Sequence, residues 1–372
     1  MIPARHFALL ALSVLVAQAA VTAAAPAVRT LPLGAAAPDF KLPGVDGRTY
    51  SLKDFAAARV LVVVFTCNHC PTAQAYEDRI SKLATDYKDK AVALVAINPN
   101  DPKAVRLDEL GYTDLGDSLD EMKIRAKEKE FPFPYLYDGD TQKTARAYGV
   151  QATPHVFIFD QARKLRYVGR VDDGEVKRVK SHDARNAIEA LLDRKAVPRA
   201  KTHVFGCSTK WADKGQDAKK ALAAWDEEPV KLDALGEAGV ARLVKNDTKK
   251  LLLVNVWRTG CASCVTELPE LVTMNRMYRG RAFRFVTISV DDPEKPQDAL
   301  KVLRKKHVAA GNYIATAKDP DRFADRLDKE WEGPVPHTLL IAPGGKVIFR
   351  QTGAIDALEV RRAIVGYLGR TY

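Results

Sequence analysis

Four of the five cysteines in this chain form two C-x-x-C pairs, Cys67 with Cys70 and Cys261 with Cys264, whereas Cys207 stands alone. Two thiols separated by two residues can form and break a disulfide, or they can ligate a metal ion. Five cysteines among 372 residues are too few for a scaffold held together by disulfides. The pattern therefore indicates redox or metal chemistry rather than a structural framework.

Other interpretations of the two pairs are weaker. One zinc ion held by all four paired cysteines would require the pairs to meet, but each pair follows its own predicted buried strand. Attachment of a haem would require a histidine directly after each pair, where Pro71 and Val265 stand instead. Inert structural disulfides remain an alternative to redox-active ones, and no metal site is predicted.

The residues around each pair predict the same succession of elements twice. An apolar run of strand length precedes each pair, which is typical of a strand buried on both faces. A helical pattern, a second strand, a charged helical stretch, a proline opening an apolar strand, and a closing helix follow each pair. In the first copy we expect strands at 59–65, 91–97 and 152–159 and helical stretches at 117–130 and 183–192. In the second copy we expect strands at 251–257, 282–290 and 335–341 and helical stretches at 296–306 and 357–368.

The repeated order of motifs predicts a duplication and an α/β fold class. We place the first domain at residues 30–211 and the second at residues 230–372. A stretch rich in Lys, Asp, Glu and Ala, residues 212–229, is the predicted linker.

This order of elements, with a C-x-x-C at the start of a helix and a proline opening a later strand, resembles the thioredoxin fold. The second copy is similar to the TlpA/ResA branch of exported thiol–disulfide oxidoreductases. The residues that carry this likeness are Val254–Trp257, Cys261–Cys264, Glu267, Pro269 and Leu271. The first copy resembles the AhpC/TSA-type redoxins. It does so at Ala37–Phe40, Asp46–Gly47, Ser51–Leu52, Phe65–Pro71 and Gly206–Trp211, the last of which would place Cys207 in the first domain.

The resemblance implies two tandem thioredoxin-like domains, each a central mixed β-sheet flanked by helices, with redox-active disulfides and no other cofactor. By analogy, Cys67 and Cys261 are the nucleophiles at helix N-termini, where the pKa of a thiol is lowered. The resolving thiols are then Cys70 and Cys264. A cis proline beside each pair would leave the preceding carbonyl free for an extended substrate, which assigns substrate binding to Thr153, Pro154, Val335 and Pro336.

Two residues are candidates for modulating the thiols. His69 lies between the first two cysteines and can stabilise a neighbouring thiolate, or it is a surface residue. The buried acid that thioredoxins place six residues before the first cysteine is missing, because Leu61 and Asn255 stand there. Glu267 is a conceivable substitute in the second domain, although a solvent-facing position fits its helix as well.

The predicted function is exchange of disulfides with protein substrates and an unidentified redox partner. A peroxiredoxin-type peroxidase is an alternative, but Val60 and Val64 replace the Pro and Thr/Ser of that family's motif. A copper-delivery protein of thioredoxin fold is another alternative, although the cysteine spacing is one residue too short. Cys207 is interpreted as an inert thiol, and His155 and His337 as ordinary strand residues.

The N-terminus and the charge indicate where the chain works. Residues 1–27 combine Arg5, an apolar run and small residues that fit a cleavage site, which predicts a secretory signal or an uncleaved anchor. We therefore expect export to a bacterial periplasm, with membrane contact only through this segment. The net charge of +11 comes without basic runs interleaved with aromatics, so no nucleic-acid partner is predicted.

Overall fold

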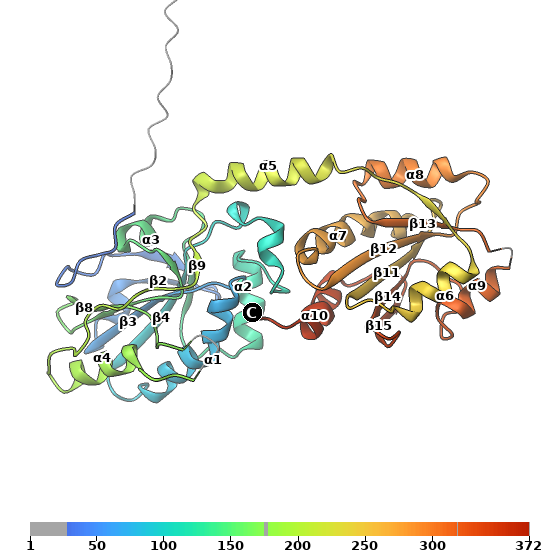
Figure 1. Ribbon diagram of the computed structural model, residues 1–372. Coiled ribbons are helices and arrows are strands. Elements are labelled where there is room, and N and C mark those ends of the chain that lie inside the picture. The colour runs from blue at the N-terminus through green and yellow to red at the C-terminus, as the bar shows by residue number, and fades with distance from the viewer. Residues whose placement is uncertain (1–27, 175–177, 318, 372) are drawn as a thin grey trace, which may run out of the picture.

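The computed structural model describes residues 28–174, 178–317 and 319–371, so the predicted signal segment 1–27 lies outside the described residues. The described chain builds two mixed β-sheets, each flanked by helices, one after the other along the sequence (Figure 1). This arrangement confirms the predicted α/β fold class.

The first sheet has the strand order β5-β4-β3-β7-β8. Its central strand β3 (Val60–Phe65) is an unbroken apolar run that is buried on both faces. β3 pairs in parallel with β4 and antiparallel with β7, so both of its edges are satisfied. The other strands are β4 (Val92–Asn98), β5 (Tyr135–Tyr137), β7 (His155–Phe159) and β8 (Leu165–Gly169). The helices are α1 (Pro71–Asp86), α2 (Leu119–Glu128), α3 (Lys143–Tyr148) and α4 (Asp183–Leu192).

The second sheet has the order β10-β13-β12-β11-β14-β15, which repeats the core of the first sheet around β11 (Leu251–Trp257). Again the central strand has one parallel and one antiparallel neighbour. The other strands are β10 (Asp233–Leu235), β12 (Phe283–Ser289), β13 (Gly311–Ala315), β14 (His337–Ile341) and β15 (Val347–Thr352). The helices are α6 (Glu237–Lys245), α7 (Ala262–Tyr278), α8 (Pro296–Lys305), α9 (Pro320–Leu327) and α10 (Ala357–Leu368).

Short elements complete the chain. A hairpin of β1 (Lys41–Pro43) and β2 (Thr49–Ser51) precedes the first sheet. The predicted strand 152–159 is broken at Pro154, since β6 (Ala152–Thr153) leaves the sheet and pairs with β9 (Cys207–Ser208). The 3-10 helices are η1 (Leu52–Phe55), η2 (Pro102–Ala104), η3 (Leu107–Leu110) and η4 (Ala212–Lys214).

The predicted linker contains a helix, α5 (Gly215–Asp226), which runs along one side of the molecule from one sheet unit to the other (Figure 1). The units also touch directly. The Tyr278 hydroxyl donates a hydrogen bond to the Thr113 carbonyl at 2.8 Å, and Arg370 forms an ion pair with Asp114 at 2.5 Å. The C-terminal end of the chain therefore lies between the two units.

Among the residues that the structure describes, no helix has both the length and the apolar character needed to cross a bilayer.

Candidate redox sites

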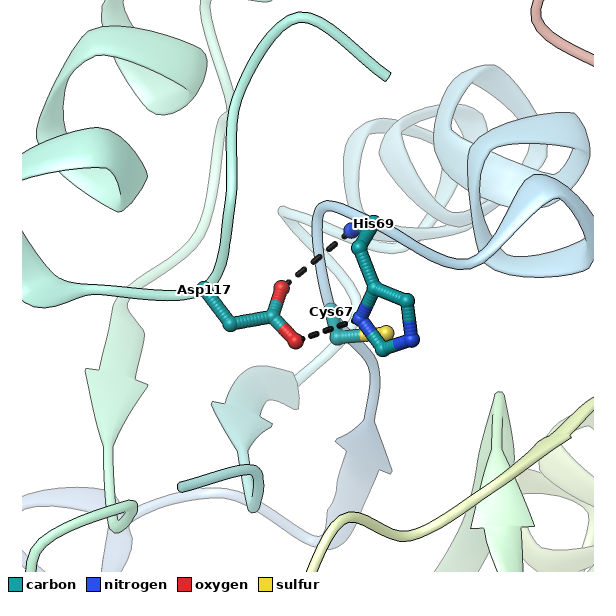
Figure 2. A group of neighbouring side chains, drawn as sticks. All are labelled: Cys67, His69 and Asp117. Carbon is teal, nitrogen blue, oxygen red and sulfur yellow. Dashed lines mark hydrogen bonds and ion pairs between the residues drawn. The ribbon is translucent and has the colours of Figure 1, made fainter. Parts of the chain in front are cut away.

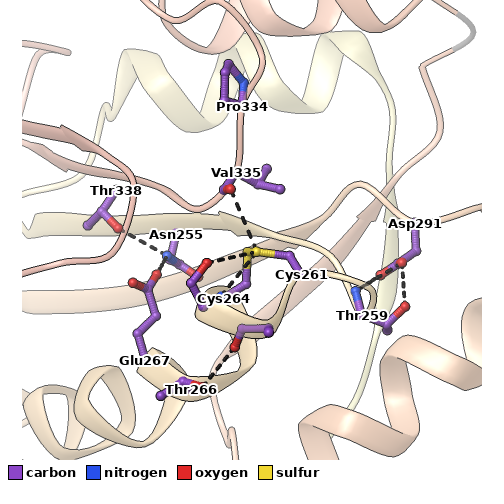
Figure 3. Close-up of a disulfide and its surroundings, with 12 residues drawn as sticks. Asn255, Thr259, Cys261, Cys264, Thr266, Glu267, Asp291, Pro334, Val335 and Thr338 are labelled. Carbon is purple, nitrogen blue, oxygen red and sulfur yellow. Dashed lines mark hydrogen bonds between the residues drawn. A yellow bond between two sulfur atoms is a disulfide. The ribbon is translucent and has the colours of Figure 1, made fainter.

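The second C-x-x-C pair lies where β11 ends and α7 begins, and it is oxidised to a Cys261–Cys264 disulfide (Figure 3). Cys261 is the N-cap of α7, and its sulfur accepts the Cys264 N–H at 3.2 Å. Cys264 is fully buried, whereas Cys261 is partly exposed beside the exposed residues Gly260 and Ala262. One sulfur of this disulfide is thus accessible at the positive end of a helix.

A cis peptide bond joins Val335 to Pro336 next to this disulfide, as predicted. The Val335 carbonyl oxygen lies 3.7 Å from the Cys261 sulfur. Val335 is half-buried and Pro334 is exposed, and no described strand pairs with this segment. The backbone beside Cys261 is therefore open to an extended peptide.

A buried polar group lies behind Cys264. The Asn255 amide donates to Glu267 Oε1 at 2.7 Å and to Thr338 Oγ1 at 3.1 Å (Figure 3). Glu267 also accepts the Ile355 N–H at 3.1 Å and is 6% exposed, so a solvent-facing position for this residue is wrong. Burial raises the pKa of Glu267, and the hydrogen bonds from Ile355 and Asn255 offset only part of that effect.

The loop before Cys261 is hydrogen-bonded to Asp291, which follows the end of the neighbouring strand β12. Asp291 accepts hydrogen bonds from the Thr259 N–H at 3.0 Å and from the Thr259 hydroxyl at 2.7 Å. This contact fixes the turn between β11 and α7 (Figure 3).

The first C-x-x-C pair is placed differently from the second. α1 begins at Pro71, which suits the first helical position because proline has no N–H to leave unpaired. The N-cap is therefore Cys70, whose sulfur accepts the Ala73 N–H at 3.4 Å. The prediction that Cys67 lies at the helix N-terminus is wrong, because Cys67 precedes the start of α1 by about one turn. Both thiols of this pair are reduced and buried.

The electrostatics of the first pair favour a thiolate on Cys70. Burial alone would raise the pKa of Cys70, but hydrogen bonds from the Cys207 and Cys67 thiols outweigh it. Together with the nearby His69, they lower this pKa well below its ordinary value. Burial and the hydrogen bond to Cys70 raise the pKa of Cys67 well above its ordinary value. The thiolate that His69 favours is thus that of Cys70.

His69 is buried against Asp117 (Figure 2). No sequence pattern had identified Asp117 as a site residue. Its Nδ1 lies 2.6 Å from Asp117 Oδ2, and Asp117 Oδ1 accepts the N–H groups of Asn68 and His69 at 2.8 and 3.2 Å. Burial opposes a charge on the imidazole, but the Asp117 carboxylate raises the pKa of His69 above its ordinary value. The surface position considered for His69 is therefore wrong.

One group of residues near the first pair offers ligand atoms for a metal ion. Ligand atoms of Cys67, His69 and Asp117 all lie within 4.8 Å of one another. However, Asp117 already holds His69 Nδ1 and the Asn100 amide, the latter at 2.7 Å. The arrangement is thus that of an oriented imidazole.

The substrate edge predicted at Thr153 and Pro154 is occupied by the chain itself. The Thr153–Pro154 peptide bond is cis, as expected, but Thr153 pairs with Cys207 in the β6–β9 ladder. The backbone before Cys207 lies so close to Thr153 that this position requires glycine. A Cβ on Gly206 (φ +138) would lie 2.1 Å from the Thr153 carbonyl oxygen. The edge beside the cis proline is therefore covered by β9 at the first C-x-x-C pair and open at the second.

His155 and His337, the residues after the two cis prolines, are both buried strand residues. His337 Nε2 lies 3.2 Å from Asp328 Oδ2. His155 Nδ1 accepts the Gln151 N–H at 3.4 Å, while its Nε2 is unpartnered among the described residues. Burial lowers the pKa of His155 to about 3.

We expect acid to destabilise the fold through His155. The folded pKa, about 3, lies below the ordinary value of 6.5, so the unfolded chain binds the extra proton first. This contribution to stability is complete above pH 6.5 and is lost as the pH falls, by up to about 1.4 kcal/mol per pH unit. Urea unfolding at several pH values should show a shallower acid loss in His155→Gln than in the wild type.

The control is His203→Gln, at an exposed position, which should keep the wild-type pH slope. Equal slopes for His155→Gln and the wild type would contradict the prediction.

The two mixed sheets with their flanking helices make this an α/β protein with thioredoxin-like units. More particularly, residues 33–168, which lie in the first unit, match the model of the AhpC/TSA family.

Solved structures are similar to parts of the chain. An uncharacterized conserved protein from Geobacillus kaustophilus is 40% identical over 48% of this chain and 92% of its own, with a TM-score of 0.44. A hypothetical protein from Sinorhizobium meliloti 1021 is 35% identical over 50% of this chain and 97% of its own, with a TM-score of 0.45. The thioredoxin domain of a thiol-disulfide oxidoreductase from Bacteroides vulgatus is 17% identical over 37% of this chain and 86% of its own, with a TM-score of 0.30.

Proposed function

We propose that the chain is an exported thiol–disulfide oxidoreductase that exchanges disulfides with protein substrates through Cys261 and Cys264. The observation that carries this proposal is the partly exposed Cys261 sulfur at the start of α7, beside the open Val335 carbonyl. Export is supported by the signal-like pattern of residues 1–27.

The exchange proceeds in two balanced steps. The reduced Cys261 thiolate attacks a substrate disulfide, so that a new S–S bond forms and the other substrate sulfur leaves as a thiolate. Cys264 then loses its proton and attacks the Cys261 sulfur, which restores the Cys261–Cys264 disulfide and releases the first substrate sulfur. Two electrons pass to the substrate, and an external dithiol returns them. The same steps in reverse oxidise a substrate dithiol.

Glu267 is suited to accept the proton that Cys264 loses. The two residues lie three positions apart on α7, which places them on one face of the helix, and both are buried. Because burial raises the pKa of Glu267, its carboxylate is more basic than an exposed one.

We expect Glu267→Gln to slow the release of substrate, because the amide accepts no proton. The turnover number should fall by about tenfold or more, with little change in KM. The wild-type rate should decline as acid protonates Glu267, and this acid limb should be absent in the variant. Insulin reduction measured across a pH series would test this. An unchanged acid limb in Glu267→Gln would argue against the proton-acceptor role, and Glu270→Gln, at an exposed position of α7, is the matched control.

A trapping experiment tests the proposed function directly. In Cys264→Ser, the resolving step is blocked, so Cys261 should remain joined to the substrate in a stable mixed disulfide. Incubation of the reduced variant with insulin should give a reductant-sensitive adduct on non-reducing gels, mapped to Cys261 by mass spectrometry.

The comparison variant is Cys67→Ser, which leaves Cys70 as the candidate attacking thiol of the covered first pair. It should trap little insulin there, because Cys70 is fully buried beneath β9. The absence of any adduct at Cys261 in Cys264→Ser would refute the proposed function.

A further inference from the structure

Three thiols gather in the first unit, although only two belong to its C-x-x-C pair. Cys67, Cys70 and Ala73 form a small buried cluster, and Cys207 packs against it. The Cys207 N–H donates to the Cys70 sulfur at 3.4 Å. Cys67 and Cys207 therefore both lie next to Cys70.

The fold holds Cys207 in this place. The ladder between β6 and β9 sets Cys207 opposite Thr153 and Ser208 opposite Ala152. Thr153 in turn contacts both paired cysteines, with its hydroxyl 3.1 Å from the Cys67 sulfur and its carbonyl oxygen 3.4 Å from the Cys70 sulfur. The segment carrying Cys207 thus occupies the edge beside the cis proline, where the second unit is open.

We propose that Cys207 is a third redox-active thiol, which forms a disulfide with Cys70 in place of the Cys67–Cys70 disulfide. The segment around Cys207 acts as a built-in substrate of the first pair, held as an extended strand against Thr153.

The proposed chemistry has two steps, and only the first, the oxidation of Cys67 and Cys70, needs an external oxidant. A low-molecular-weight disulfide accepts two electrons from these thiols and leaves as two thiols, forming the Cys67–Cys70 bond. The Cys207 thiolate then attacks the Cys70 sulfur. The Cys70–Cys207 bond forms, the Cys67–Cys70 bond breaks, and Cys67 leaves with the electron pair and takes up the proton lost by Cys207.

The charges around Cys70 explain why Cys207 is inactive while the site is reduced. The hydrogen bond to Cys70, burial and the charge of the Cys70 thiolate raise the pKa of Cys207, so it keeps its proton. A disulfide at Cys70 carries no charge, and its formation removes this repulsion. The third thiol is therefore released for attack by the oxidation of the pair.

The test is disulfide mapping of the full chain after equilibration with oxidised glutathione. Trypsin should release residues 60–79, which contain Cys67 and Cys70, and residues 202–210, which contain Cys207. In Cys67→Ser, we expect these peptides to be cross-linked, with the cross-linked share at least about tenfold above that in reduced glutathione. Cys70→Ser should lose most of this cross-link, and Ser208→Ala should keep it.

Two results would overturn the proposal. One is a Cys67→Ser protein in which Cys70 and Cys207 both remain alkylatable after oxidation. The other is a wild type in which none of the three thiols becomes oxidised. The Cys261–Cys264 pair in the same digest reports that the buffer was oxidising. Since the mapping needs no substrate turnover, its outcome is independent of the proposed function.

Discussion

Replacing Cys261 with serine is expected to reduce the disulfide reductase activity of the chain to the uncatalysed background. Cys261 has the only partly exposed sulfur of its pair, and it caps the N-terminus of α7, where the helix favours a thiolate. A serine hydroxyl at this position is not ionised at neutral pH and cannot form a disulfide. We expect a loss of about 100-fold or more in kcat/KM for insulin, measured with a dithiol as electron donor.

The corresponding variant of the first pair distinguishes the two sites. Cys67→Ser removes a thiol that is 2% exposed and lies 3.1 Å from the hydroxyl of Thr153, the residue that pairs with Cys207. We expect its activity on insulin to stay within about twofold of the wild type, because a covered sulfur contributes little to exchange with proteins. A loss in Cys67→Ser as large as that in Cys261→Ser would show that protein substrates reach the first pair.

The substitution Gly206→Ala is expected to uncover the first pair. The backbone of Gly206 has φ +138, and a Cβ there would lie 2.1 Å from the Thr153 oxygen, so β9 must move away from β6. Strain of this kind costs about 1–3 kcal/mol, which corresponds to roughly a 5- to 150-fold increase in the population of the open form. Alkylation of Cys70 by N-ethylmaleimide, followed on the peptide 60–79, should accelerate by a factor in that range.

Gly280→Ala is the matched control, because a Cβ at Gly280 meets nothing within 4 Å. It should leave the alkylation rate of Cys70 unchanged. If Gly206→Ala reacts no faster than the wild type, then β9 is not the barrier that protects the first pair.

The sequence predicted the elements that depend on local patterns. The apolar run 251–257 and the amphipathic helices 183–192 and 357–368 match the structure, because burial periodicity determines each of them without reference to distant residues. Both predicted cis prolines are confirmed as well. The duplicated order of motifs was enough to indicate two sheets of related topology.

The details of the first site depend on contacts that no local pattern encodes. Asp117 lies 48 residues from His69, and Cys207 lies 137 residues from Cys70. The chain brings them together only when the loop after η3 packs against the start of α1, where Gln74 donates to the Tyr112 carbonyl, and when β9 pairs with β6. The helix start at Cys70 had a local signal, since Pro71 favours the first helical position, but the analogy with the second pair concealed it.

The loop 113–117 belongs to both units at once. The Thr113 carbonyl accepts a hydrogen bond from the Tyr278 hydroxyl, and Asp114 forms an ion pair with Arg370. Asp117, at the end of the loop, orients the imidazole of His69. The contacts that dock the second unit and the contact that orients His69 therefore lie within five consecutive residues. Thermodynamic linkage is reciprocal: if oxidation at Cys70 changes the affinity of the units for each other, a ligand that parts the units changes the redox equilibrium at Cys70 by the same coupling free energy.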